Sequence, residues 1–262
     1  MRIVIIGIGK MGSWLVNELV TDHEVAVYDR NKDRASAIKG ATPISDLSAI
    51  KKFTPEILIN AVSLQNTIKA FEEVLPYLSD DCVICDVASV KGDLPAHYKR
   101  YGKRFVSIHP MFGPTHANME NLKQESLVII KESDQDTAKF FRELFGKLGL
   151  KIFEYTFAEH DQIMAYSLTT PFAASLVFAA CVDKQAIPGT NFARHMALSK
   201  GLLSEDDHLL AEILFNPYSI RQIENINGRL ELLKHIIKGR DYEEAKKFFD
   251  RLRKNIGSDY DD

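Results

Sequence analysis

Two different hydrophobic patterns divide the chain near residue 155. Before it, short runs rich in β-branched residues predict strands at 2–6, 24–28, 56–61, 82–87, 104–108, 126–131 and 150–155. Between these runs, residues 11–20, 65–78 and 136–148 carry apolar side chains at the three-to-four spacing of amphipathic helices. Strands that alternate with helices are typical of a parallel sheet covered by helices. We therefore predict a doubly wound α/β domain over residues 1–155.

After residue 155 the β-rich runs stop, and residues 156–262 are predicted to form an all-helical domain. Helix breaks are expected near Pro171, Pro188-Gly189, Gly201, Asn216-Pro217 and Gly239. The segments Phe172–Val182 and Leu209–Phe215 are apolar on every side, so they need a surface that covers them. We expect a homodimer whose interface comes mainly from residues 160–256 of this dimerisation domain.

The composition is that of an average globular protein, with 262 residues, 45% hydrophobic residues and a formal net charge of −3. This mild charge argues against nucleic-acid binding. The longest apolar stretch, Phe172–Val182, has 11 residues, whereas a membrane span needs about 20. The N-terminal sequence lacks the features of a signal peptide. We expect a cytoplasmic protein that binds no membrane.

Three cysteines are too few for a disulfide framework. Cys82 and Cys85 lie in one predicted strand at an odd spacing, so their thiols are expected on opposite faces of the sheet. This placement argues against a redox or zinc role, and we expect no metal site.

A glycine-rich turn, Gly7-Ile-Gly-Lys-Met-Gly12, joins the first predicted strand to a predicted helix. This strand–turn–helix context is the one that the dinucleotide-binding fingerprint of a Rossmann-like fold requires. Gly7 would make the tight turn, Gly9 would let backbone N–H groups approach a pyrophosphate, and Gly12 would allow close packing. The pyrophosphate is expected at the helix N-terminus, which favours anions. The expected cofactor contacts are Gly7, Ile8, Gly9, Lys10, Met11, Gly12, Asp29, Arg30 and Ser63.

Asp29 ends the second predicted strand, 17 residues after Gly12, close to the usual spacing of a ribose-binding carboxylate. A carboxylate there would bind the 2′-hydroxyl of NAD and repel the 2′-phosphate of NADP. Arg30 could accommodate that phosphate or stack on the adenine, so NADP stays open while NAD is favoured. The alternative interpretation is a Rossmann-like domain that binds another nucleotide or none.

A second group of polar residues follows two later strands, in Asp86-Val-Ala-Ser-Val-Lys91 and Ser107-Ile-His-Pro-Met-Phe-Gly-Pro114. Open α/β sheets bind ligands at the carboxyl ends of their strands. Because prolines and a glycine follow His109, we expect its ring on a stiff loop at this edge. Histidine titrates near neutral pH and can act as a general base beside a nicotinamide. The alternative is a loop histidine that caps a strand.

Three segments resemble the prephenate dehydrogenase family: His109-Pro-Met-Phe-Gly-Pro114, Glu159-His-Asp-Gln-Ile-Met-Ala165 and Ala88-Ser-Val-Lys91. With the glycine turn and the helical second half, the similarity covers nearly the whole chain. It implies oxidative decarboxylation of prephenate to 4-hydroxyphenylpyruvate in tyrosine biosynthesis, with NAD or NADP accepting the hydride. It also implies that His109 takes the proton of the ring hydroxyl. Ser89 would hydrogen-bond this hydroxyl or the nicotinamide region.

The sequence departs from the family in the substrate region. Many members carry an arginine that binds a substrate carboxylate, and the matching position here is Gly201. Lys200 and Arg194 are the nearest cations and are expected to replace it, with Arg221 and Arg229 as further candidates. Two more residues expected to contact substrate are Thr115 and His116.

Three other functions compete with this interpretation. Arogenate dehydrogenation is the same reaction on the amino analogue, which would tolerate the loss of one cation. A β-hydroxy acid or imine dehydrogenase would need a lysine and an asparagine where the chain has Glu159-His-Asp-Gln162. A regulator that senses dinucleotide or tyrosine would have no need of His109 and Ser89.

Overall fold

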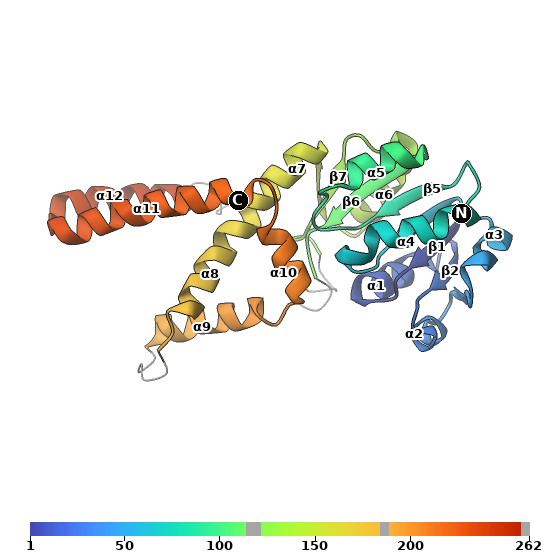
Figure 1. Ribbon diagram of the computed structural model, residues 1–262, viewed down its shortest axis with the longest axis horizontal. Helices are drawn as coiled ribbons and strands as arrows, with labels where there is room; N and C mark the ends of the chain where they lie inside the picture. The colour runs from blue at the N-terminus through green and yellow to red at the C-terminus, as the bar shows by residue number, and fades with distance from the viewer. Residues whose placement is uncertain (114–121, 184–188, 258–262) are drawn as a thin grey trace. The chain divides into compact units, whose positions relative to one another are not determined.

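The computed structural model describes residues 1–113, 122–183 and 189–257, which divide into two compact units (Figure 1). Unit 1 contains Met1–Met164 and Leu203–Asn216, and unit 2 contains Ala165–Leu202 and Pro217–Asp262. The expected boundary after residue 155 differs from this division. Phe157 packs in the core beneath the sheet, and Asn216 Nδ2 donates a hydrogen bond to the backbone oxygen of Asp161. Both contacts tie residues from the predicted helical half to unit 1.

Unit 1 is built on an eight-stranded sheet with the order β3-β2-β1-β4-β5-β6-β7-β8. Its strands are β1 (Arg2–Ile6), β2 (Glu24–Tyr28), β3 (Thr42–Pro43), β4 (Ile57–Asn60), β5 (Val83–Asp86), β6 (Phe105–Pro110), β7 (Ser126–Ile130) and β8 (Lys151–Tyr155). All seven predicted strands are present, and among the residues that the structure describes only the short β3 was not predicted. The strand order reverses between β1 and β4, which creates the switch point at which doubly wound sheets bind nucleotides.

One strand pair departs from the predicted parallel arrangement. β7 runs antiparallel to β6, with Ile108 opposite Ile129 and His109 opposite Val128, whereas β8 is parallel to β7. A strand buried on both faces reads as a continuous apolar run in either direction. The sequence pattern therefore gave the position of β7 and not its direction.

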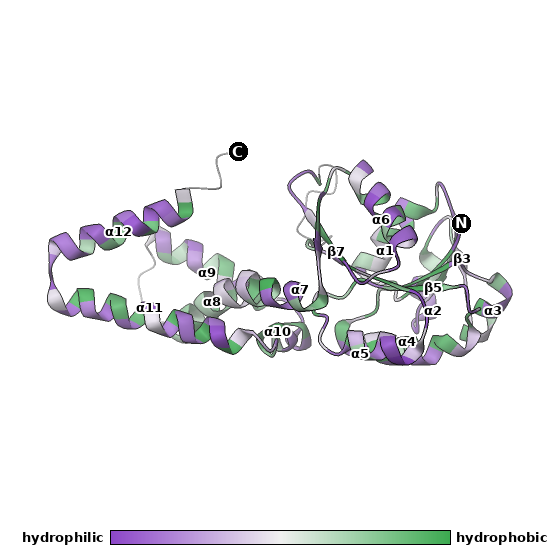
Figure 2. Ribbon diagram, turned by 90° about the horizontal axis from the view of Figure 1, so that it is seen from above, coloured by the Kyte–Doolittle hydropathy of each residue, from purple (hydrophilic) through white to green (hydrophobic). Residues whose placement is uncertain are grey.

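Two apolar clusters fill the opposite faces of the sheet, because alternate side chains of a strand point to opposite sides. Helix α1 (Lys10–Leu19) and helix α6 (Gln135–Lys147) contribute Leu15 and Phe141 to one cluster. Helix α4 (Thr67–Val74) and helix α5 (Leu94–Tyr101) contribute Phe71 and Tyr98 to the other. Figure 2 shows α1 and α6 on one side of the sheet and α4 and α5 on the other. Unit 1 also contains the helices α2 (Lys32–Ala37), α3 (Ile50–Phe53), α7 (Phe157–Met164) and α10 (Asp207–Leu214).

Cys82, directly before β5, and Cys85, within β5, are both buried. Cys82 belongs to one apolar cluster and Cys85 to the other, which confirms that the two thiols point to opposite faces. Burial raises the pKa of Cys82 to about 11, and burial followed by the Asp86 charge raises the pKa of Cys85 as well. Both side chains are therefore unreactive thiols of the core.

Unit 2 is helical. It comprises a π-helical segment, Ala165–Thr169, followed by α8 (Thr170–Ala180), α9 (Thr190–Leu202), α11 (Ser219–Gly239) and α12 (Tyr242–Gly257). Pro171 lies in the first turn of α8, directly after the π-helical segment. The break expected there is absent, because the chain stays helical from α7 into α8.

By length and composition alone, the 24-residue helical stretch Phe157–Ala180 could cross a membrane. The sequence estimate missed this stretch because it counted only the uninterrupted apolar run. Near its start, His160 and Asp161 are buried and hydrogen-bonded to each other. This end of the stretch is part of the α/β core of unit 1.

Candidate active site

The turn after β1 is packed so closely that two of its glycines are required. Gly7 has a φ of +88°, and a Cβ there would lie 2.6 Å from the Val62 nitrogen. A Cβ on Gly12 would lie 2.0 Å from the Gly7 carbonyl oxygen. At Gly9, by contrast, an added Cβ would meet nothing within 4 Å. The backbone at Gly9 therefore faces open space that a ligand can approach.

Helix α1 begins directly after this turn. Its N-cap, Gly9, provides no side-chain hydrogen bond, and its first turn contains no acidic residue. The first N–H groups of the helix are thus available to an anion, which the helix dipole also favours. Lys10 is exposed and Met11 is half-buried in this turn. This arrangement fits a pyrophosphate.

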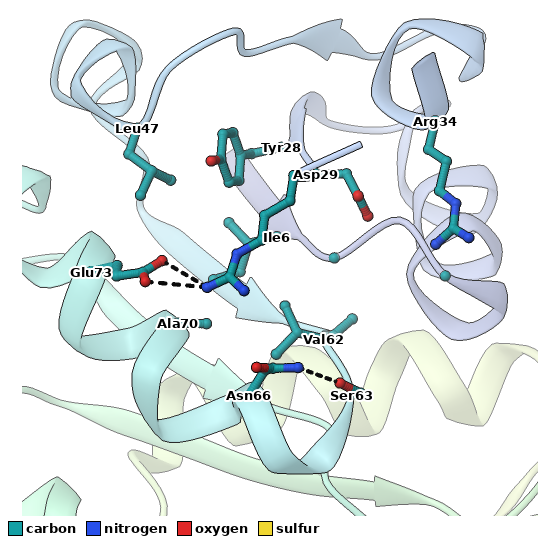
Figure 3. Close-up of a pocket in the computed structure, with 14 residues that line it drawn as sticks. Ile6, Tyr28, Asp29, Arg34, Leu47, Val62, Ser63, Asn66, Ala70 and Glu73 are labelled. Carbon is teal, nitrogen blue, oxygen red and sulfur yellow. Dashed lines mark hydrogen bonds and ion pairs between the residues drawn. The ribbon is translucent and has the colours of Figure 1, made fainter. Parts of the chain in front are cut away.

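A pocket of about 340 Å³ opens beside the glycine turn (Figure 3). It is lined by Ile6, Gly7, Gly9, Tyr28, Asp29, Arg30, Arg34, Leu47, Ala61, Val62, Ser63, Asn66, Ala70 and Glu73. Apolar side chains such as Leu47 and Val62 could contact an adenine, and the polar side chains could contact a ribose. The lining therefore fits the adenosine half of a dinucleotide.

Asp29 is one of the polar residues that line the pocket. One carboxylate oxygen accepts a hydrogen bond from the Ile8 backbone nitrogen at 2.7 Å, and the other accepts one from the Asn31 nitrogen at 2.8 Å. These bonds hold the carboxylate beside the glycine turn. Each oxygen keeps a further lone pair with which it can accept a hydrogen bond from a ribose hydroxyl.

Two further predicted contacts also line the pocket. Arg30 is ion-paired with Glu73 of α4 at 3.2 Å. The Ser63 hydroxyl accepts a hydrogen bond of 2.8 Å from Asn66 Nδ2. Ser63 follows β4 and Arg30 follows β2, so the pocket is formed at the carboxyl ends of strands on both sides of the switch point.

A second polar cluster lies at the carboxyl ends of β5 and β6. Lys91 and Asp86 are fully buried, and Lys91 Nζ lies 2.7 Å from Asp86 Oδ1. Lys91 Nζ also donates to the Ile108 backbone oxygen at 2.8 Å, and the Tyr98 hydroxyl donates to Asp86 Oδ2 at 2.6 Å. Burial, followed by the Asp86 charge, raises the pKa of Tyr98 well above its ordinary value. Tyr98 is therefore a neutral hydrogen-bond donor in this cluster.

His109 is the next-to-last residue of β6, and its ring is buried. The expectation that it would lie on a loop was wrong, because β6 continues through His109 and Pro110 by pairing with β7. A paired strand holds the backbone of His109, and with it the imidazole, more rigidly than a loop would. Ser89, in the segment between β5 and α5, is half-buried.

His109 is linked to a second histidine and an aspartate from α7. Its Nδ1 lies 3.0 Å from His160 Nε2, and His160 Nδ1 lies 2.9 Å from Asp161 Oδ1. Asp161 also accepts hydrogen bonds from the backbone nitrogens of Lys91 at 3.3 Å and Gly92 at 3.2 Å. A carboxylate accepts hydrogen bonds and donates none, so all of these groups donate to Asp161.

The directions of these hydrogen bonds follow from the acceptor at the end of the chain. Because the Asp161 carboxylate accepts, His160 carries its proton on Nδ1, and its Nε2 must accept from His109 Nδ1. His109 in this tautomer has an unprotonated Nε2. The His160–Asp161 pair therefore prepares His109 Nε2 to accept a proton.

Burial keeps both imidazoles neutral. For His109, burial first and then the charges of His160 and Lys91 lower the pKa well below the ordinary value of 6.5. Burial also lowers the pKa of His160, although the hydrogen bond that His160 donates to Asp161 opposes this effect. At neutral pH His109 is thus in the form that a general base requires.

The remaining predicted site residues belong to unit 2 or lie outside the described residues. Lys200 and Arg194 are both exposed on α9 of unit 2. Gly201, the position of the family arginine, is in the last turn of the same helix. Thr115 and His116 lie outside the residues that the structure describes. Within the described ranges, no group of three or more His, Cys, Asp and Glu side chains could hold a metal ion.

Several site residues were missed by the sequence reasoning. The segment Glu159-His-Asp-Gln162 was recognised as a motif, but neither His160 nor Asp161 was expected to contact His109. Asp86 and Lys91 were recognised as the ends of one motif, but their ion pair was not predicted. Arg34 and Glu73 gave no sequence signal, because each reaches the pocket from a helix face that reads as ordinary surface.

The match to known proteins agrees with this geometry. The model of the prephenate dehydrogenase nucleotide-binding domain matches residues 16–153, more than half of the 262-residue chain. The chain is 22% identical to a probable arogenate/prephenate dehydrogenase of Methanocaldococcus jannaschii, over 98% of the chain and 61% of the relative. It is 26% identical to the chloroplastic arogenate dehydrogenase 1 of Arabidopsis thaliana, over 92% of the chain and 40% of the relative.

Among solved structures, prephenate dehydrogenase from A. aeolicus in complex with hydroxyphenyl propionate and NAD+ has a TM-score of 0.83 and 18% identity. The alignment covers 97% of this chain and 96% of that one. The chain spans only 40% to 61% of the length of the two relatives described above. The family match and the shared fold show that this chain is a member of the prephenate dehydrogenase family of oxidoreductases.

Proposed function

We propose that the protein catalyses the NAD-dependent oxidative decarboxylation of prephenate to 4-hydroxyphenylpyruvate. The observation that supports this proposal most directly is the His109–His160–Asp161 relay at the carboxyl ends of the central strands. It supplies a rigid, neutral base on the same edge of the sheet as the nucleotide pocket. The reaction requires both a hydride acceptor and a base for the ring hydroxyl.

In this mechanism His109 moves one proton. NAD, when bound, supplies the acceptor for the hydride from the hydroxyl-bearing ring carbon. His109 Nε2 accepts the hydroxyl proton, so that this carbon becomes a carbonyl. Loss of the ring carboxylate as CO₂ leaves its bonding electrons in the ring, which becomes aromatic. The ring oxygen then takes back the proton from His109 as a phenol, and the base is regenerated.

The neighbouring residues orient these groups. His160 and Asp161 hold the His109 ring in the accepting tautomer. We assign Ser89 to a hydrogen bond with the substrate hydroxyl or the nicotinamide region. Lys200, Arg194, Thr115 and His116 remain our candidates for contacts with the substrate carboxylates and side chain.

Arogenate is the second candidate substrate, and Gly201 is the observation that favours it. A glycine there cannot provide the cation that binds a carboxylate in many family members. Arogenate carries an ammonium group where prephenate carries a keto group, so its smaller net negative charge would require fewer cations.

We also propose that unit 2 forms a homodimer. Large apolar side chains are exposed on its helices, among them Val177, Leu198, Ile220, Leu230, Ile237, Phe249, Leu252 and Ile256. Apolar and polar stretches alternate along α11 and α12 (Figure 2), and α12 has no buried residue. An exposed apolar surface of this kind is typical of a subunit interface.

A turnover assay that crosses prephenate and arogenate with NAD and NADP tests the function. Prephenate with NAD should give the highest kcat/KM. His109→Asn should lower kcat by about 10²- to 10⁴-fold, the usual contribution of a positioned base, while NADH binding persists. Higher kcat/KM with arogenate would reverse the substrate assignment. A His109→Asn enzyme that keeps more than about a third of wild-type kcat would exclude His109 as the base.

A further inference from the structure

Glu73 holds Arg30 at the wall of the nucleotide pocket. Arg30 Nη2 lies 3.2 Å from both carboxylate oxygens of Glu73, and both residues line the pocket together with Asp29. Figure 3 shows Glu73 on α4 directed toward the interior of the pocket, with both ion-pair contacts drawn. Lys69, one helical turn earlier, lies 3.9 Å from Glu73 and helps to fix the position of the carboxylate.

This ion pair changes what Arg30 can do for a bound nucleotide. An arginine beside the ribose-binding acid is a usual partner of the 2′-phosphate of NADP. Here the guanidinium already has a carboxylate partner. A 2′-phosphate would have to displace Glu73 or bind beside its negative charge, and it would meet the Asp29 carboxylate as well.

The charges of the pocket support the same conclusion. Its charged lining residues in the described chain are Asp29, Glu73, Arg30 and Arg34, so the two acids offset the two arginines. The Arg34 guanidinium forms no ion pair or hydrogen bond with another described residue. NAD brings no charge to the 2′ position, whereas NADP brings about two negative charges there. Removing the Glu73 charge would make the lining positive and release Arg30.

We propose that Glu73 is a determinant of cofactor specificity, which acts through Arg30 and together with Asp29 to disfavour the 2′-phosphate of NADP. This inference rests on the proposed use of NAD. It assigns a function to a residue of α4 that lies far from Asp29 in the sequence. It also gives Arg30 a defined role, as a side chain that Glu73 neutralises and holds at the wall of the pocket.

Equilibrium titrations of NADH and NADPH, followed by nicotinamide fluorescence, test the proposal on the full chain. Glu73→Gln removes the charge and keeps the size of the side chain. It should lower the Kd for NADPH by about tenfold at low ionic strength, because the released Arg30 guanidinium can then attract the 2′-phosphate with one unit charge a few ångströms away. The Kd for NADH should change by less than about twofold, because no new charge meets its 2′-hydroxyl.

The neighbouring residue provides a matched control. Glu72 is on the same helix, but it accepts a hydrogen bond from Arg100 and is not among the pocket residues. Glu72→Gln changes the net charge by the same amount and should leave both Kd values within about twofold of wild type. If it tightened NADPH binding as much as Glu73→Gln, a general charge effect would replace the proposal.

The double variant Arg30→Ala/Glu73→Gln tests the role of Arg30. Relative to Arg30→Ala alone, Glu73→Gln should lose most of its effect on NADPH, since no guanidinium remains to be released. Full persistence of the tenfold gain without Arg30, or an unchanged NADPH/NADH ratio in Glu73→Gln, would overturn the proposal. If wild type binds NADH but does not turn over prephenate, only the proposed substrate is refuted. If wild type binds neither nucleotide, the proposed function and the role of Glu73 are both refuted.

Discussion

His160 offers a sharp test of the relay, because two substitutions separate its two hydrogen bonds. In His160→Gln, the side-chain oxygen can take the place of Nε2 and still accept from His109 Nδ1, which lies 3.0 Å from Nε2 in the wild type. In His160→Asn, the shorter amide can replace only the Nδ1 contact with Asp161, which is 2.9 Å long. His109 then has a buried N–H without a partner, or its ring turns to the wrong tautomer.

The expected loss follows from the penalty for one buried, unpaired group. Leaving such a donor unsatisfied costs about 1–3 kcal/mol. If this penalty falls on the reactive form of His109, kcat drops by about 5- to 150-fold in His160→Asn. His160→Gln should recover most of that loss. Circular dichroism and NADH titration serve as controls that both variants fold and bind cofactor.

The pH dependence of kcat provides a second readout that a purely structural role would not change. His160 is neutral at neutral pH, but in acid its positive charge is one cause, after burial, of the lowered pKa of His109. Without that charge the pKa of His109 rises, so the ascending limb of kcat should move to higher pH in both variants. If His160→Asn kept more than half of wild-type kcat with an unmoved limb, or if Gln were no better than Asn, the relay would be refuted.

Three further predictions follow from the same structure. The free energy of unfolding should fall as the pH drops below about 6.5. The buried His109 and His160 have lowered pKa values in the folded state, so the unfolded chain binds more protons at such a pH. Urea titrations that show constant stability from pH 7 to 5 would contradict this. Gly12→Ala should prevent correct folding, because its Cβ would lie 2.0 Å from the Gly7 oxygen, whereas Gly9→Ala should fold normally and weaken NADH binding, as thermal melts and titrations would show. Sedimentation at micromolar concentration should give a dimer mass, and Ile237→Glu on the exposed face of α11 should shift it toward monomer; a monomeric wild type would refute the dimer.

Local sequence patterns predicted much of unit 1. The seven longer strands, the turn at Gly7–Gly12 and the position of Asp29 after β2 depend on neighbouring residues, whose preferences can be read in a short window. His109 was also recognised from its surroundings. Its placement on a loop was wrong, because the pairing that extends β6 comes from β7, a separate part of the chain.

The contacts that define the chemistry are long-range in sequence. His160 lies 51 residues after His109, and Glu73 lies 43 residues after Arg30. A sequence can indicate that such residues are unusual, as the Glu159-His-Asp-Gln162 motif did, but the partner depends on how the elements pack. For Glu73, which occupies an ordinary polar position on α4, even the indication was absent.

The buried pair of Lys91 and Asp86 connects these separate parts of the site. Removing two charges from water costs more than their attraction typically returns, so a fully buried ion pair is weak evidence for stability. Its contacts suggest another reason for its presence. Lys91 Nζ donates to the oxygen of Ile108, the residue before His109, and the backbone nitrogen of Lys91 donates to Asp161. One residue thereby fixes both the strand that carries His109 and the carboxylate of Asp161, and its positive charge helps to keep both imidazoles neutral.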